Sequence, residues 1–135
     1  MITGIHHVKL PVTDVARSRR WYERVLGFEM VIEFVEDGEL MGVAMARSDC
    51  HSQVALRRDP GRAQALSGFD AVALLVPSPD RVHDWAAALD RLGEPHGDVV
   101  TGHGGGAVLV GVHDPDGIEI RLYADPPTPR ERRQP

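Results

Sequence analysis

An internal repeat is the sequence feature that most constrains how this chain can fold. Three pairs of matching positions keep their order at an offset of 64 to 66 residues: Val8 and Val72, Trp21 and Trp85, and Leu26-Gly27 and Leu92-Gly93. We interpret these matches as a duplicated module of about 60 residues. Two such modules account for nearly all of the 135 residues and favour one domain with a shared core.

Each module begins with a strand pattern. Val8, Leu10 and Val12 alternate with His7 and Lys9, which predicts a half-buried strand whose apolar side packs under a helix. The second module repeats this alternation with another set of apolar residues, Val72, Leu74 and Val76.

A helix and three shorter strands follow in each module. Asp14 and Ser78 are typical N-caps, and Gly27 and Gly93 are typical helix ends. The sequence predicts strands at residues 28–35, 40–46 and 53–57 in the first module, and at 98–101, 107–113 and 118–123 in the second. An Asp-Pro-Asp-Gly turn at 114–117 separates the last two strands. The element order is therefore βαβββ, twice.

The domain limits follow from this order. We expect a single domain over residues 1–124, with the first module at 1–60 and the second at 68–124. Residues 58–67 read as the linker between the modules. Residues 125–135 are rich in proline and charge without apolar periodicity, which predicts a disordered tail.

Composition excludes several functional classes. The net charge of −5 argues against general nucleic-acid binding, and no apolar run approaches the ~20 residues of a membrane span. Cys50 is the only cysteine, so a disulfide framework and a CxxC metal or redox motif are excluded. A cytoplasmic protein is the expectation.

Four short motifs point to a family. They are Ile5–Asp14 (IHHVKLPVTD), Trp21-Tyr22, Leu26–Phe28 (LGF) and Asp114–Gly117 (DPDG). In this order they resemble the vicinal oxygen chelate superfamily of glyoxalases, bleomycin resistance proteins and extradiol dioxygenases, and the resemblance covers residues 4–124. It implies an α+β fold in which the two tandem βαβββ modules form a cupped, mixed, mostly antiparallel sheet, with helices outside and a ligand cavity inside. It also implies a homodimer.

Enzymes of this superfamily hold one divalent metal with a residue from the first and last strand of each module. The resemblance places these positions at His7, Ala55, Ala71 and Arg121, of which only His7 can ligate a metal. A shifted alignment offers Gln53, Glu119 or Tyr123. It does not replace Ala71, because the neighbouring Asp70 should face the helix side. We therefore expect no cofactor, with a divalent metal on His7 and Glu119 as the alternative.

The cavity-facing positions predict the ligand-binding residues. By strand alternation they comprise six polar side chains: His7, Lys9, Arg57, Glu119, Arg121 and Tyr123. Two arginines and one lysine against one carboxylate favour an anionic or carbonyl-bearing small molecule, with its apolar body against nearby alanines. The plainer alternative is that Arg121 pairs with Glu119 and that Arg57 reaches solvent.

The remaining histidines and glycines indicate no further site. His6 is expected on the helix side or at the entry of the first strand, and the other histidines at the surface. Residues 102–106 (GHGGG) lack the Lys-Ser/Thr of a phosphate loop and precede a strand, so a hairpin loop or flexible rim is the interpretation. Cys50 beside His51 makes a poor nucleophile pair, because neighbours on a strand face opposite sides.

These patterns favour a metal-independent, small-molecule-binding protein, with catalytic residues unassigned. The first alternative is an enzyme. It is either a metal-dependent lyase, isomerase or ring-cleaving dioxygenase, or a metal-free enzyme with Glu119 or His7 as general base and Arg121 stabilising an enolate. The second alternative is a protein-interaction module with a collapsed cavity.

Overall fold

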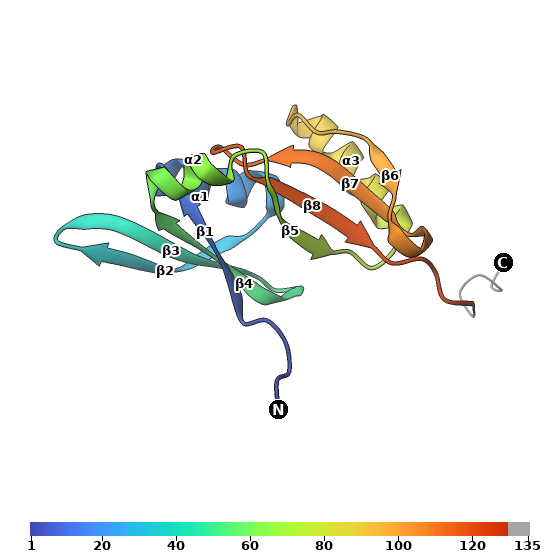
Figure 1. Ribbon diagram of the computed structural model, residues 1–135, viewed down its shortest axis with the longest axis horizontal. Helices are drawn as coiled ribbons and strands as arrows, with labels where there is room; N and C mark the ends of the chain where they lie inside the picture. The colour runs from blue at the N-terminus through green and yellow to red at the C-terminus, as the bar shows by residue number, and fades with distance from the viewer. Residues whose placement is uncertain (130–135) are drawn as a thin grey trace. The chain divides into compact units, whose positions relative to one another are not determined.

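The computed structural model describes residues 1–129 and confirms an α+β fold of two βαβββ modules (Figure 1). Contacts divide the chain into two compact units. Unit one comprises residues 1–67 and 114–116, and unit two comprises residues 68–113 and those from 117 onward.

The first module forms a four-stranded sheet beside one helix. Its elements are β1 (His7–Val12), α1 (Val15–Leu26), β2 (Glu29–Glu36), β3 (Glu39–Arg47) and β4 (Cys50–Arg58). The strand order is β1-β4-β3-β2, in which β1 pairs parallel to β4 and the other pairs are antiparallel. Alternation along β1 and β4 buries Leu10, Val12, Val54 and Leu56. These residues form the core with the apolar stripe of α1.

The second module repeats this topology. Its elements are β5 (Asp70–Leu75), α3 (Pro79–Leu92), β6 (Val99–Thr101), β7 (Ala107–His113) and β8 (Glu119–Ala124). The strand order β5-β8-β7-β6 again has one parallel pair, β5 with β8. Residues 103–105 form one 3₁₀ turn between β6 and β7. The predicted strands are all present, with ends that differ by at most three residues and with β7 as predicted, at residues 107–113.

The predicted helix boundaries are confirmed in both modules. The Asp14 side chain accepts a hydrogen bond from the Arg17 N–H, and the Ser78 side chain accepts one from the Arg81 N–H. Gly27 and Gly93 end the helices in the left-handed conformation, at φ 71° and 69°. This conformation is accessible to glycine without a steric penalty from Cβ.

The predicted linker contains a helix that the sequence analysis missed. Within residues 58–67 the chain forms α2 (Pro60–Leu66), which begins after the N-cap Asp59 with proline in the first turn. Ala63 is its only buried residue, so the segment has no apolar periodicity to indicate a helix.

Unit one includes a short segment from the second module. The buried Asp114 carboxylate accepts a hydrogen bond from the Tyr22 hydroxyl at 2.9 Å. The Asp116 carboxylate accepts from the Thr13 N–H at 3.1 Å and lies 3.7 Å from Arg17. Burial and the Asp114 charge raise the pKa of the Tyr22 phenol well above its usual value. The Asp-Pro-Asp turn therefore anchors the start and the middle of α1.

Residues 125–128, at the start of the predicted tail, form neither helix nor strand. The rest of the predicted tail, residues 130–135, lies outside the described residues. Within residues 1–129, none of the helices has the length and hydropathy needed to cross a membrane.

Candidate functional site

The first sheet has a far face, which we define as the face turned away from α1. Strand register places residues of four strands in one row across it: Lys9, Ala55, Ala44 and Ile32. The next row contains Pro11, Arg57, Gly42 and Phe34. A Cβ on Gly42 would lie 3.7 Å from both the Arg57 and the Phe34 side chains, which shows that these two point to the same face. Small residues thus occupy three of the four positions on the middle strands β3 and β4, and Arg57 occupies the fourth.

Arg57 is paired on this face. Its two terminal nitrogens donate to the two carboxylate oxygens of Glu36, each at 2.9 Å. This pair lowers the pKa of Glu36 and raises that of Arg57. The structure therefore places a neutral ion pair where the sequence analysis expected a free cation.

Lys9 and His7 are exposed on β1. Within residues 1–129, Lys9 forms no ion pair at 4.0 Å or less, and it is in register with the small, buried Ala55. Lys9 is therefore the cation best placed on this face to attract an anionic or carbonyl group.

The far face of the second sheet, turned away from α3, contains a charged cluster. The Nε of Arg121 donates to Glu119, and its Nη1 lies 3.2 Å from Asp70. His113 lies 3.6 Å from the other oxygen of Glu119. The hydrogen bond to Glu119 and the charges of Glu119 and Asp70 raise the pKa of Arg121. Two carboxylates thus neutralise the guanidinium, as the plainer alternative for Arg121 anticipated.

The position of Asp70 corrects the sequence analysis, which expected it on the helix side. The pairing of β5 with β8 advances from Asp70↔Glu119 to Val72↔Ile120, so Ala71 is an extra residue. Such an irregularity changes which residues share a face. Asp70 therefore lies on the side of Arg121.

The Tyr123 side chain contacts the glycine-rich loop at residues 102–106. Its hydroxyl donates to the His103 carbonyl at 3.3 Å. A Cβ on Gly102 would lie 2.7 Å from the same hydroxyl, so only glycine allows the loop to approach this closely. The six predicted ligand residues therefore lie on two far faces: His7, Lys9 and Arg57 in unit one, and Glu119, Arg121 and Tyr123 in unit two.

The residues at the implied metal positions do not fit a divalent metal. Ala55 and Ala71 have no donor atom, and Arg121 places a positive charge at the third position. Glu119, the substitute ligand, is already bonded to that guanidinium. Among residues 1–129, no group of three or more His, Cys, Asp or Glu side chains is placed to hold a metal ion.

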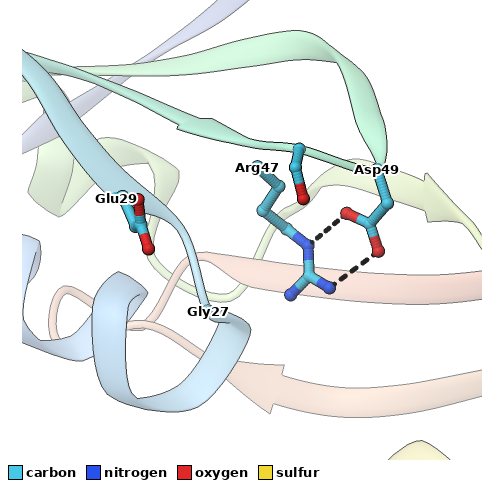
Figure 2. A pocket seen from close by; sticks show the side chains of 5 residues that line it. Gly27, Glu29, Arg47 and Asp49 are labelled. Carbon is cyan, nitrogen blue, oxygen red and sulfur yellow. Dashed lines mark hydrogen bonds and ion pairs between the residues drawn. The ribbon is translucent and has the colours of Figure 1, made fainter.

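A polar depression of about 210 Å³ lies at the end of α1 (Figure 2). Its lining consists of Gly27, Glu29, Arg47, Ser48 and Asp49. The Arg47 guanidinium donates to the Asp49 carboxylate at 2.8 and 2.9 Å and, through its third nitrogen, to the Leu26 carbonyl. Figure 2 shows the pairing of Arg47 with Asp49. The hollow is smaller than the ~300–1,000 Å³ of typical ligand pockets. Arg47, which lines this hollow, attaches the end of β3 to the end of α1 through its hydrogen bond to Leu26.

Two carboxylates of the far faces were missed by the sequence analysis. Glu36 reaches Arg57 because the β2–β3 hairpin and the β3–β4 pair bring distant strands into register. Asp70 reaches Arg121 because of the irregularity at Ala71. The acidic residues were visible in the sequence, but their faces depend on register and bulges.

Comparison with known proteins identifies the family. Residues 4–122 match the Glyoxalase/Bleomycin resistance protein/Dioxygenase superfamily, and the chain belongs to it. The chain is 34% identical over 131 residues to a catechol-2,3-dioxygenase of Bacillus subtilis (strain 168). That match covers 93% of this chain but only 42% of the relative, so the chain spans less than half of the relative's length.

Solved structures show the same fold at low sequence identity. A glyoxylase/bleomycin resistance protein/dioxygenase domain from Frankia sp. EAN1pec has a TM-score of 0.75 and 19% identity, covering 99% of this chain and 100% of that one. An antibiotic-binding protein from Streptomyces sp. CB03234 has a TM-score of 0.70 and 20% identity, covering 92% of this chain and 97% of that one. These similarities concern the fold alone.

Proposed function

We propose that this chain is a small-molecule-binding protein that works without a metal and holds an anionic or carbonyl-bearing ligand on the far faces of its sheets. One observation carries the proposal: Ala55, Ala71 and Arg121 stand at three of the four positions implied for metal ligands. A catalytic first-row metal normally needs about three protein ligands and an open position. A binding protein needs no such set.

The far face of the first sheet supports the choice of ligand. Lys9 supplies a positive charge at one edge, and Ala55 and Ala44 provide small side chains beside it. With strands about 4.8 Å apart, the row from Lys9 to Ile32 spans about 14 Å. A ligand with an anionic or carbonyl oxygen at Lys9 and an apolar body over the alanines matches this row.

The other five proposed ligand residues have weaker roles. An acid group of the ligand competes with Glu36 for Arg57 and with Glu119 for Arg121, because both arginines are already paired. His7 and Tyr123 supply hydrogen-bonding groups. Lys9 therefore contributes the strongest single contact.

The test is ligand binding in the presence of a chelator. Tag-free protein in EDTA is titrated with benzoate, salicylate and catechol, and binding is followed by the change in tryptophan fluorescence. We expect at least one probe to bind in EDTA, about tenfold more weakly in Lys9→Gln, as expected for loss of one charge-assisted hydrogen bond. Lys9→Arg retains most of the affinity.

The control is Arg81→Gln, which removes an exposed arginine on α3. This variant should bind the probes like the unchanged protein. Absence of binding by all three probes, or binding that disappears in EDTA, contradicts the proposal.

A second candidate function is a metal-dependent ring-cleaving dioxygenase, lyase or isomerase. The 34% identity to a protein named catechol-2,3-dioxygenase favours the dioxygenase within this class. His7 and Glu119 are the ligands this chain offers. Oxygen consumption with catechol and Fe²⁺, lost in both His7→Ala and Glu119→Gln, would establish the enzyme.

We also propose a cytoplasmic homodimer. The edge strand β2 exposes Val31, Ile32, Phe34 and Val35, and exposed apolar edges favour pairing with another chain. Sedimentation equilibrium should give twice the 14.8 kDa mass of the chain. A monomer at all concentrations would contradict the dimer without affecting the ligand-binding proposal.

A further inference from the structure

His6 and His7 form a pair of facing imidazoles in unit one. Their Nδ1 atoms lie 2.9 Å apart, and the rings meet edge to face with centroids 5.2 Å apart. Both side chains are exposed. Because β1 begins at His7, the alternation of the strand does not force His6 to the opposite face.

The backbone that carries this pair is fixed on β4. The His6 carbonyl accepts a hydrogen bond from the Gln53 N–H at 2.9 Å, and the Ile5 carbonyl accepts one from the Ser52 hydroxyl at 2.7 Å. Binding at the two rings therefore requires little ordering of the chain, which favours affinity.

The Nδ1 atoms of His6 and His7 can both donate a lone pair to the same cation. A ring that carries its proton on Nδ1 donates this proton to the other ring across the separation of 2.9 Å. When the donor ring carries its proton on Nε2 instead, both Nδ1 atoms are free to ligate. Neutral rings thus bind a metal by a change of tautomer without net release of a proton, whereas protonated rings must each lose one.

The separation of the two Nδ1 atoms matches one coordination angle better than another. With metal–nitrogen bonds of about 2.0–2.1 Å, two atoms 2.9 Å apart subtend about 90° at the metal. A tetrahedral ion would need them about 3.3 Å apart. An angle of 90° suits square-planar and tetragonal ions, and Cu²⁺ has the highest affinity for nitrogen ligands among the first-row divalent ions.

We propose that His6 and His7 form a two-imidazole site for a tetragonal divalent cation, Cu²⁺ above all. Within residues 1–129, no third His, Cys, Asp or Glu completes the pair, so water fills the remaining positions. The site shares only His7 with the implied four-position site, and it lies entirely in unit one. It does not rest on the proposed organic ligand.

The test is a titration of chelator-free, tag-free protein with CuCl₂, followed by calorimetry and electron paramagnetic resonance. We expect one equivalent of Cu²⁺ with a tetragonal spectrum and hyperfine splitting from two nitrogens. His6→Ala and His7→Ala should each weaken binding at least tenfold and remove one nitrogen from the splitting. Zn²⁺ should bind at least tenfold more weakly than Cu²⁺.

The matched control is His51→Ala, which removes another exposed histidine of unit one. It should leave Cu²⁺ binding unchanged. Because His6 is exposed, His6→Ala should keep the unfolding temperature of the unchanged protein, which separates loss of ligand from loss of fold. Cu²⁺ binding that survives in His6→Ala, or that is lost in His51→Ala, overturns the proposal. Retention of copper in His6→Ala but not in His7→Ala would instead indicate a site of the second candidate function.

Discussion

The two modules share one topology but bury their helices to different extents. Helix α1 buries six residues, whereas α3 buries only Val82 and Leu89. The repeated tryptophans show the same contrast. Trp21 is 7% exposed and packs edge to face on Tyr22, while Trp85 is half-buried and lines a shallow depression of about 270 Å³. The same topology therefore forms with fewer buried residues on α3 than on α1. The helix of unit one packs against its sheet with more buried side chains than the helix of unit two.

The segments that follow α1 and α3 also differ, since the first is held by apolar burial and the second by polar contacts. In unit one, Gly27 is followed by Phe28, which is 1% exposed and closes the core. In unit two, His96 holds the corresponding region by polar contacts, to Asp90 at 2.6 Å and to the Gly97 carbonyl at 2.7 Å. Unit one is closed by a contact that does not depend on pH, and unit two by one that does.

The largest expected effect comes from removing the repeated tryptophans one at a time. Trp21→Ala should lower the free energy of unfolding by about 3–5 kcal/mol, because it opens a cavity in a packed core. Trp85→Ala should lower it by about 1 kcal/mol, because only part of that side chain leaves water on folding. Urea denaturation followed by circular dichroism measures both. Equal losses would show that exposure does not report the contribution of each helix to stability.

A smaller difference should separate the two tyrosines. Tyr22→Phe removes the donor to the buried Asp114 carboxylate, which should cost about 1.5–3 kcal/mol of stability. Tyr123→Phe removes a longer bond to the His103 carbonyl and should change stability by no more than about 0.5 kcal/mol. Thermal unfolding of both variants would test this order. A larger loss for Tyr123→Phe would place an essential anchor in unit two.

The smallest effect concerns pH and is confined to unit two. The bond to the Gly97 carbonyl, together with Asp90, raises the pKa of His96 above the 6.5 of the unfolded chain. The stabilisation is therefore complete below pH 6.5 and is lost as the pH rises through the folded-state pKa. Exposed ion pairs contribute about 0.2–1 kcal/mol. Between pH 6 and 9, stability should fall more in the unchanged protein than in His96→Gln, as measured by urea denaturation. Parallel pH profiles would assign no such role to His96.

The sequence was sufficient for the architecture because each module repeats simple signals. Alternation in β1 and the caps at Asp14 and Gly27 each depend on neighbouring residues, and all were confirmed. Helix α2 was missed because seven residues with one buried side chain carry no periodic pattern. Missing α2 did not change the predicted topology, because the two modules each indicate the same βαβββ order.

The site was less predictable because its contacts connect residues distant in sequence. Which carboxylate meets Arg57 depends on the register of two strand pairs, and which meets Arg121 depends on one extra residue at Ala71. His6 was expected on the helix side or at the entry of the first strand, and the structure places it at the entry, directly before β1, with its ring against that of His7. Faces can be read from alternation only inside a regular strand.

The Asp-Pro-Asp turn gives unit one a dependence on the order of synthesis. The hydroxyl of Tyr22 bonds to Asp114, 92 residues later in the chain, and the N–H of Thr13 bonds to Asp116, 103 residues later. A ribosome adds roughly 5–20 residues per second, so the first module waits several seconds for these partners after its own strands have emerged. Unit one therefore completes its hydrogen bonds only after residues 114–116 have been synthesised. A gene fragment encoding the first repeat alone would produce a module without these anchors for its helix.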